Sequence, residues 1–296
     1  MSAPETLTLA SLAATTFTGP QLGVLGDPIA HSLSPAMHGA ALAALGATHP
    51  ALAGLRYHRL HIVAAELPAA LRLLRAKGFT GLNLTVPHKI AALDLVETLA
   101  PAARRAASVN TLVATPTGWA GHTTDGQGFL EALRERAGAG VAGRPVVLLG
   151  AGGAARAVAA ACLDAGCDRL TIHNRDAAKA RELAAALADV RAGGDGLDAL
   201  TSLPAAAVVV NCTTLGLKAD DPSPLGDVAP RPGHFVFDTT YAAAPSRLLR
   251  DARAGGAEGC DGRPMLRWQG ALAFRLWTGI LPPAAPMRRA LGEPAS

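Results

Sequence analysis

The sequence predicts an α/β protein of two domains. Its 296 residues exceed what one small core requires, and half of them are apolar, which is enough for a buried interior. Short apolar runs alternate with segments of helical spacing along most of the chain, a pattern typical of mostly parallel sheets covered by helices. A hairpin pattern at Thr115–Trp119, followed by a helical pattern from Asp125, separates two sets of such alternations. We therefore place a domain boundary at Asp125.

The first domain is expected to comprise residues 1–124 together with 263–296. Its strand and helix candidates alternate in the order Leu22–Leu25, Pro35–Leu45, Tyr57–Ile62, Glu66–Lys77 and Gly81–Leu84. Pro35 directly after Ser34 favours a helix start there. The amphipathic segment Trp268–Thr278 is expected to pack back on this domain, whereas residues 1–20 form a short Ser/Thr/Ala-rich extension of unknown purpose.

The second domain, residues 125–262, contains a glycine motif in a specific context. The strand candidate Val146–Leu149 runs into Gly150-Ala151-Gly152-Gly153-Ala154-Ala155, and a helical pattern follows. A first glycine permits a tight turn, a second lets backbone approach a pyrophosphate, and the N–H groups of Gly153 and Ala154 face its charge. Further strands are predicted at Leu170–His173, Val208–Asn211 and Phe235–Asp238, with helices at Ala177–Ala188 and Pro245–Ala254 among them. The domain is therefore expected to be Rossmann-like.

The end of the second strand of this domain indicates which dinucleotide binds. An NAD site usually places an Asp or Glu there to accept from the ribose hydroxyl. This chain has Asn174-Arg175-Asp176, with Lys179 one helical turn later. Arg175 could bind a 2′-phosphate through charge-assisted hydrogen bonds, which favours NADP. Alternatively, Arg175 is a solvated loop residue and Asp176 caps the next helix.

Composition excludes several classes of function. The net charge is +4, but the Lys and Arg residues are scattered and aromatic residues make up only 4% of the chain, so a nucleic-acid partner is not expected. The absence of Lys or Arg before Arg56 argues against a secretory leader, and no apolar run is long enough for a membrane span. Four cysteines without metal-ligand spacing predict no metal site. We expect a cytoplasmic protein with a small anionic ligand.

Several polar motifs lie at predicted strand ends and occur in a fixed order along residues 22–281. They are GDPIAHSLSP at 26–35, NLTVPHK at 83–89, VNT at 109–111, TTDG at 123–126, GAGGAAR at 150–156, Asn174-Arg175 with Lys179, NCTTLG at 211–216, DTTY at 238–241, and Gln269. In these motifs the chain resembles the shikimate dehydrogenase family, including its quinate/shikimate relatives.

The resemblance implies an NADP-dependent oxidoreductase that interconverts 3-dehydroshikimate and shikimate in aromatic amino acid (chorismate) biosynthesis. Lys89 matches the catalytic lysine, which exchanges a proton with substrate while hydride moves to or from the nicotinamide, and Asp125 matches its partner. The substrate-binding positions are Ser32, Ser34, Thr85, Asn110, Tyr241 and Gln269. Besides the glycine motif, the cofactor-binding positions are Asn174, Arg175, Lys179, Thr213, Gly262 and Met265.

Structural roles remain open for several of these residues. Lys89 could be an exposed residue at a helix start, Asp125 and Ser34 could be helix N-caps, and Asn110 could be bonded to its own backbone in a loop. Met265 could be a packing residue.

The chain also departs from the family pattern. Thr123 stands where Asn is usual, Pro264 replaces a glycine, and Arg267 and Trp268 replace smaller residues. These departures leave open a quinate or related polyhydroxy-acid dehydrogenase, or a non-catalytic NADP-binding sensor. A monomer or a homodimer is expected.

Overall fold

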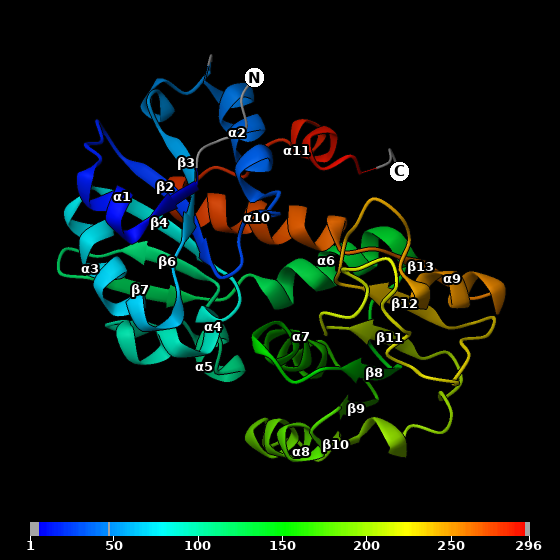
Figure 1. Cartoon of the computed structure of the whole chain (residues 1–296). Helices are drawn as coiled ribbons and strands as arrows, with labels where there is room; N and C mark the ends of the chain where they lie inside the picture. The colour runs from blue at the N-terminus through cyan, green and yellow to red at the C-terminus, as the bar shows by residue number, and fades with distance from the viewer. Residues whose placement is uncertain (1–5, 47, 294–296) are drawn as a thin grey trace. The chain divides into compact units, whose positions relative to one another are not determined.

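The computed structural model of the protein describes residues 6–46 and 48–293. The chain divides into two compact units (Figure 1). Of the described residues, unit 1 contains those up to Thr124 and those from Gln269 onward, and unit 2 contains Asp125–Trp268. The sequence places the second domain boundary at residue 263, six residues before the position at which the units divide.

Unit 1 is built on a mostly parallel sheet. Within the described residues its strand order is β1-β3-β2-β4-β6-β7-β5, and β6 alone runs antiparallel to its neighbours β4 and β7. The strands are β1 Thr6–Thr8, β2 Gln21–Gly26, β3 Arg56–His61, β4 Phe79–Leu84, β5 Thr98–Leu99, β6 Thr111–Ala114 and β7 Trp119–His122. The predicted strands and the predicted hairpin are confirmed.

The helices of unit 1 include short turns that the sequence pattern did not reveal. The α-helices are α1 Leu9–Ala14, α2 Ser34–Leu45, α3 Leu67–Ala76, α4 His88–Ala91, α5 Pro101–Ala106 and α11 Ala284–Leu291, and the 3₁₀ turns are Pro50–Leu52, Ala64–Glu66 and Ala92–Leu95. In α3, Leu67, Ala70, Leu71 and Leu74 are buried, so their spacing gives one apolar face. The C-terminal helix α11 packs against α2, as expected for a chain that returns to its first domain.

Residues 1–20, an extension whose purpose the sequence leaves open, have a structural role in the part that is described. Thr6–Thr8 pairs in parallel with β3, and the capped helix α1 follows directly. Leu7 and Leu12 are buried in the main core of unit 1. The segment is too short to show a clear period in the sequence, which explains why the pattern missed it. Residues 1–5 of the predicted extension lie outside the described residues.

Unit 2 has the strand order of a Rossmann-like domain. All strand pairs of the sheet β10-β9-β8-β11-β12-β13 that the structure describes are parallel. The order reverses between β8 and β11, and ligands bind at such switch points in open α/β sheets. The strands are β8 Pro145–Leu149, β9 Arg169–Asn174, β10 Ala192–Gly196, β11 Val208–Asn211, β12 Phe235–Asp238 and β13 Glu258–Cys260. The predicted Rossmann-like sheet is confirmed.

Helices connect most of these strands. The connecting helices are α7 Gly153–Asp164, α8 Ala177–Ala186 and α9 Arg247–Ala254, with a 3₁₀ turn at Leu197–Ala199, and α6 Asp125–Ala137 precedes the first strand. Gly126 permits a close approach of α6 to α7, because a Cβ there would lie 2.5 Å from the carbonyl oxygen of Ala157. The apolar residues of β8 and β11 are buried, as is usual for central parallel strands.

Helix α10, Arg263–Thr278, begins five residues earlier than the sequence pattern predicted. Pro264 therefore occupies the first turn of a helix, where a backbone N–H has no partner within the helix and the fixed φ of proline suits the backbone. The replacement of glycine by Pro264 thus removes no helical hydrogen bond. Residues 263–268 of this helix belong to unit 2 and the rest to unit 1.

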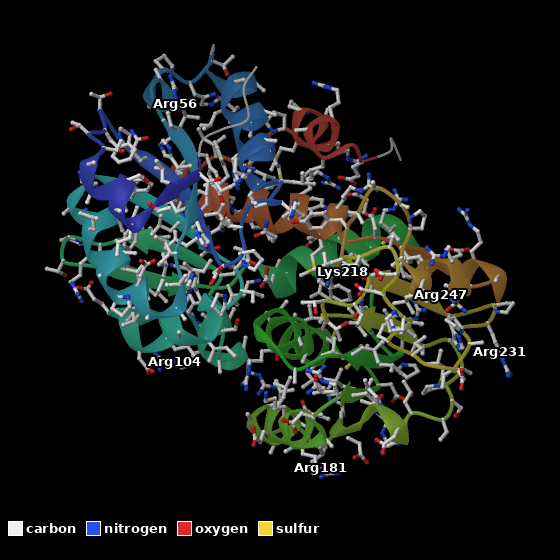
Figure 2. The ribbon with its side chains drawn as sticks, viewed as in Figure 1. Arg56, Arg104, Arg181, Lys218, Arg231 and Arg247 are labelled. Atoms are coloured by element: carbon white, nitrogen blue, oxygen red, sulfur yellow. The ribbon has the colours of Figure 1, made fainter. Side chains whose placement is uncertain are left out.

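Exposed positive charge is spread over separate segments. Figure 2 labels Arg56 and Arg104 in unit 1, and Arg181, Lys218, Arg231 and Arg247 in unit 2. Lys218 and Arg231 share the long connection between β11 and β12, and each of the others lies on a different helix or strand. Across residues 6–46 and 48–293, no helix has the length and apolar character needed to cross a bilayer.

Candidate functional site

A network of buried polar side chains lies at the strand ends of unit 1, centred on Asn110. The Asn110 Nδ2 donates to Thr124 Oγ1 at 2.9 Å and to Gln269 Oε1 at 3.3 Å, and its Oδ1 accepts from the backbone N–H of Thr124 at 2.8 Å. All three residues are less than a tenth exposed. Asn110 is therefore not bonded only to its own loop: it joins the end of the hairpin to helix α10.

A second layer of this network holds Asn83, the penultimate residue of β4. Its Nδ2 donates to the Asn110 carbonyl and to Thr111 Oγ1, and its Oδ1 accepts from the Tyr57 hydroxyl at 2.7 Å. Burial raises the pKa of Tyr57, so its hydroxyl remains a donor at neutral pH. The ring of Tyr57 stacks on His38, whose pKa burial lowers to about 3. Sequence reasoning missed Tyr57, because a tyrosine within a strand is usually a packing residue.

Ser32 and Ser34 lie in the turn that leads from β2 into α2. The Ser32 carbonyl accepts from Arg59 Nη2 at 3.0 Å, and Ser34 is the first residue of α2. The helix is capped by Leu33 without a side-chain hydrogen bond. The alternative that Ser34 is the N-cap is therefore wrong, and its hydroxyl is not used in capping.

Lys89 is the second residue of the short helix α4, close after the end of β4. Its backbone carbonyl accepts from the N–H of Val109 at 2.8 Å, and its side chain is half-buried, so it is not the fully exposed residue of the alternative interpretation. The preceding His88 donates from Nε2 to the Ile62 carbonyl at 2.7 Å. Burial lowers the pKa of His88, so the ring packs as a neutral group. The half-buried Thr85 forms the turn before α4, accepting from the His88 N–H.

In unit 2 the glycine motif forms the turn between β8 and α7, at the switch point of the sheet. Gly150 has a φ of +108°, which favours glycine, and a Cβ there would lie 3.0 Å from the carbonyl oxygen of Cys212 at the end of β11. Gly152 is the N-cap of α7, and a Cβ there would meet nothing within 4 Å. The backbone N–H groups of Gly153 and Ala154 lie in the first turn of α7. The face of the turn at Gly152 is thus open, whereas Gly150 packs against protein.

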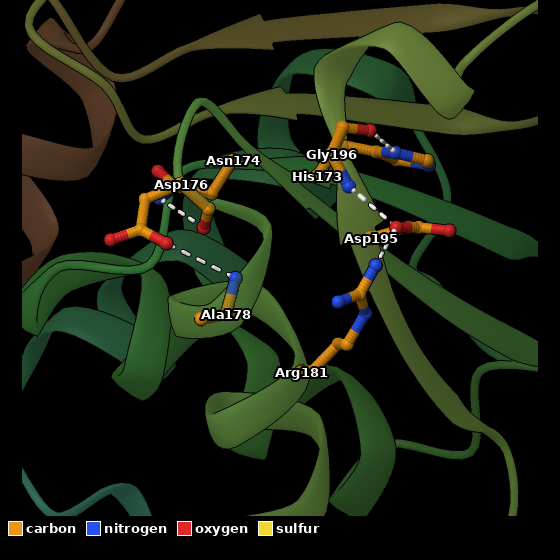
Figure 3. Close-up of polar contacts among 7 residues, drawn as sticks. All are labelled: His173, Asn174, Asp176, Ala178, Arg181, Asp195 and Gly196. Atoms are coloured by element: carbon orange, nitrogen blue, oxygen red, sulfur yellow. Dashed lines mark hydrogen bonds and ion pairs between the residues drawn. The ribbon is translucent and has the colours of Figure 1, made fainter.

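The turn after β9 is ordered by its own polar groups (Figure 3). Asp176 caps α8 by accepting from the N–H of Ala178, and Asn174 Nδ2 donates to the Asp176 carbonyl at 3.0 Å. Asp176 is therefore an N-cap, as the alternative interpretation held. Arg175 is exposed, and Lys179 Nζ lies 3.8 Å from Asp176. This strand end accordingly carries two exposed cations and no carboxylate other than the capping one.

The loop after β11 is fixed by two buried polar side chains, Asn211 and Asp238. Asn211 accepts from Thr213 and donates to Asp238 at 2.9 Å, and Asp238 also accepts from Thr240 and Ser246. Burial raises the pKa of Asp238 despite these donors. Asp238 has no predicted site role, although its place at the end of a buried strand within DTTY could have indicated one. Burial also raises the pKa of the half-buried Tyr241 in the same segment.

The remaining predicted positions of unit 2 are buried. Gly262 packs so closely on the backbone of Thr239 that no Cβ would fit, and Met265 is 6% exposed. Both positions therefore have a packing role. Asp125 is the first residue of α6 and is 3% exposed.

These features of unit 2 fit a dinucleotide. The turn at Gly152 leaves open space at the N-terminus of the twelve-residue helix α7. The first N–H groups of a helix can bind an anion that occupies such a space. The exposed Arg175 and Lys179 at the end of β9 suit a 2′-phosphate better than a bare ribose hydroxyl. In the part of the chain that is described, no group of three His, Cys, Asp or Glu side chains could hold a metal ion.

Comparisons with known proteins agree with this arrangement. Residues 24–112 match the family described as shikimate dehydrogenase substrate binding domain, residues 132–218 match shikimate/quinate 5-dehydrogenase, and residues 262–291 match the shikimate 5′-dehydrogenase C-terminal domain. The chain is 45% identical over 278 residues to the shikimate dehydrogenase (NADP(+)) of Symbiobacterium thermophilum, a match that covers 91% of this chain and 92% of that protein.

Two solved structures extend the comparison. The shikimate 5-dehydrogenase of Thermus thermophilus in complex with NADP(H) and shikimate is 37% identical, with a TM-score of 0.76 over 92% of this chain and 98% of that one. The 5-ketofructose reductase of Gluconobacter is 32% identical, with a TM-score of 0.80 over 93% and 99% of the two chains. The sequence matches span most of the chain at substantial identity, and the chain belongs to the shikimate dehydrogenase family.

Proposed function

We propose that this chain is an NADP-dependent shikimate dehydrogenase that interconverts 3-dehydroshikimate and shikimate. The observation that carries the proposal is the buried network of Asn110, Thr124 and Gln269 in unit 1. It joins residues 159 positions apart in the chain and fixes two carboxamides. Fixed amide groups suit the recognition of hydroxyls on a small ring, because a polar group left unpaired in the site penalises the wrong substrate.

In this proposal unit 1 supplies most of the substrate contacts, and unit 2 binds the cofactor. Unit 1 binds the acid: Ser32 and Ser34 bind the carboxylate, and Thr85, Asn110 and Gln269 contact the ring substituents. From unit 2, Tyr241 contributes to carboxylate binding, as the family pattern implies. Unit 2 binds NADP through Gly150, Gly152, Gly153, Ala154, Asn174, Arg175, Lys179, Thr213, Gly262 and Met265.

Oxidation of shikimate removes a hydride from carbon and a proton from the attached hydroxyl. NADP, when bound, supplies the hydride acceptor. Lys89, as a neutral amine, accepts the hydroxyl proton and passes it to solvent, and the reverse reaction uses the ammonium form as proton donor. Asp125 hydrogen-bonds a substrate hydroxyl. The products are 3-dehydroshikimate, NADPH and one proton, so atoms and charge balance.

A substrate panel tests the proposal. Purified protein is mixed with shikimate, with quinate or with no acid, each in the presence of NADP⁺ or NAD⁺, and the reduced nicotinamide is followed by its near-ultraviolet absorbance. We expect the highest kcat/KM for shikimate with NADP⁺. A higher kcat/KM for quinate would assign the chain to the other activity of its family. Binding of NADP⁺ without turnover of either acid would favour a sensor.

We also propose that the protein acts in the cytoplasm as a monomer or homodimer, without nucleic-acid or membrane partners. A small, freely diffusing acid and NADP are its expected ligands. Light scattering on the purified chain, with and without NADP⁺, distinguishes the two oligomeric states. Fractionation of cells that express it tests the location.

A further inference from the structure

A charged cluster in unit 2 includes the two residues of α10 that directly precede, in the chain, a residue that the proposed function assigns to substrate contact. It consists of Glu135 on α6 with Arg267 and Trp268 on α10, and we call it the Glu135 cluster. The Arg267 Nη2 lies 2.7 Å from both carboxylate oxygens of Glu135, and the Trp268 indole N–H donates to Glu135 Oε2 at 2.8 Å. The Arg267 guanidinium also lies 5.2 Å from the centre of the Trp268 ring, a cation–π contact.

Arg267 is buried in this cluster, and Glu135 and Trp268 are partly buried. The Arg267 side chain is 1% exposed and the Glu135 side chain 16%. A buried ion pair does little for net stability compared with apolar residues of the same volume, whereas removing one partner leaves an uncompensated charge. Because a gain in net stability does not explain the Glu135–Arg267 ion pair, its geometry points to a role in orienting this turn of α10.

Two consecutive residues of one helix bind the same carboxylate. Consecutive side chains of an α-helix point about 100° apart around its axis. Donors from both Arg267 and Trp268 can therefore reach Glu135 in only a narrow range of rotations of this turn. The next residue is Gln269, so its direction is fixed by the same two contacts.

The hydrogen bond of Gln269 to Asn110 depends on the rotation of α10 about its axis. Its Oε1 accepts from Asn110 Nδ2 at 3.3 Å, a long hydrogen bond that a small rotation of α10 would break. Asn110 is itself held by Thr124, so it cannot follow Gln269 if the helix turns. We propose that the Glu135 cluster is a positioning device that sets the side chain of Gln269 for substrate. The proposal rests on the assignment of Gln269 to the substrate site.

The mildest test is Trp268→Phe, which removes one N–H and retains a ring. We expect KM for shikimate to rise roughly 5- to 10-fold, the effect of one weakened hydrogen bond, with KM for NADP⁺ within about two-fold of wild type. In a Gln269→Ala background the same change should raise KM no further, since it acts through Gln269. Trp277→Phe is the matched control: this tryptophan lies on the same helix, and its indole N–H donates to the Leu112 carbonyl at 2.9 Å. It should leave both KM values unchanged.

A second measurement does not depend on substrate. The chain has three glutamines, Gln21, Gln127 and Gln269, so selective ¹⁵N-glutamine labelling gives three side-chain amide signals. We expect the Gln269 amide to gain mobility in its relaxation when Trp268→Phe or the apolar pair E135M/R267M is introduced. Gln21, which donates to the carbonyls of Thr18 and Gly19, should stay rigid in every variant.

The outcomes separate the two proposals. If wild-type protein does not oxidise shikimate, the proposed function fails, and the relaxation of Gln269 still decides the role of the Glu135 cluster. Unchanged Gln269 relaxation in both Trp268→Phe and E135M/R267M would overturn the positioning role. Additive effects of Trp268→Phe and Gln269→Ala on KM would also overturn it.

Discussion

The two units present different chemistry at the ends of their strands. In unit 1 the groups are side chains fixed by one another, as in the bonds among Asn110, Thr124 and Gln269. In unit 2 the central feature is backbone, a turn whose glycines either pack on protein, as Gly150 does, or leave open space, as Gly152 does. In the proposed function, selection among acids would therefore depend on particular side chains, and phosphate binding would depend on the course of the main chain.

The ionisable groups that the units bury also differ. In unit 1, burial lowers the pKa of His38, His58, His88 and His122. In unit 2, burial raises the pKa of Asp238. A histidine whose pKa is lowered in the folded state makes folding less favourable as the pH falls below the pKa that it has in the unfolded state. A carboxyl with a raised pKa makes folding more favourable in acid. Mild acid should therefore destabilise unit 1 before it destabilises unit 2.

Lys89→Ala gives the largest expected effect, because it removes the proposed proton acceptor from unit 1 and leaves unit 2 intact. We expect kcat to fall by roughly 10³-fold, within the range of general acid–base catalysis, while the Kd for NADP⁺ stays within about two-fold. Steady-state kinetics and titration calorimetry measure the two quantities. A variant that retained most of its kcat would remove Lys89 from the mechanism.

Gly150→Ala and Gly152→Ala distinguish the two kinds of glycine in the turn of unit 2. At Gly150 the positive φ and the nearby Cys212 carbonyl should cost about 1–3 kcal/mol of the free energy of unfolding. At Gly152 a methyl group has room in the protein, so stability should hold while affinity for NADP⁺ falls. Chemical denaturation and calorimetry check both. Equal losses of stability would contradict the assignment.

His38→Leu tests the acid sensitivity of unit 1. With a folded pKa of about 3 against 6.5 unfolded, His38 should account for about 2 kcal/mol of stability lost between pH 7 and pH 5. The variant should show a correspondingly flatter dependence of its unfolding free energy on pH. His31→Leu, which changes an exposed histidine, is the control. If both variants keep the wild-type slope, His38 does not cause the loss.

Arg175→Ser gives the smallest expected effect and tests the cofactor choice. Losing a charge-assisted bond to a 2′-phosphate should raise KM for NADP⁺ about 10-fold and leave KM for NAD⁺ unchanged. The matched control is Arg181→Ser, since Arg181 is an exposed arginine of α8 that binds Asp195 at 2.8 Å (Figure 3). An exposed pair of this kind contributes little. Equal effects of the two variants would indicate a general loss of positive charge.

The bounds of strands and helices were predicted most accurately where the apolar pattern of the segment is strongest. The strands β11 and β12 match their predicted bounds because continuous runs of Val and Phe are buried at the centre of a sheet. The strand β10, Ala192–Gly196, was missed because Ala-Gly-Gly-Asp-Gly has no strand propensity. It forms through packing, since Gly194 fits closely beneath the backbone of Ala180. Helix α10 was shortened in the prediction because its first turn contains Pro264.

The site was predictable where a residue belongs to a motif and not where its partner is distant in the chain. Asn110 and Gln269 were both named from motifs, yet nothing in the sequence indicated that they bind one another. Tyr57 and Glu135 lie outside every motif, and their roles follow from hydrogen bonds to Asn83 and Trp268. Contacts of this kind depend on the tertiary fold, which local patterns do not encode.

The strand β1 has a consequence for handling the protein. It covers the outer edge of β3 with a parallel strand of three residues, and α1 buries Leu12 directly after it. Deleting residues 6–14 would leave the N–H and C=O groups along β3 open to pairing with other chains, the usual beginning of aggregation through sheet edges. A purification tag is therefore better joined to the N-terminus through a flexible spacer than substituted for its first residues.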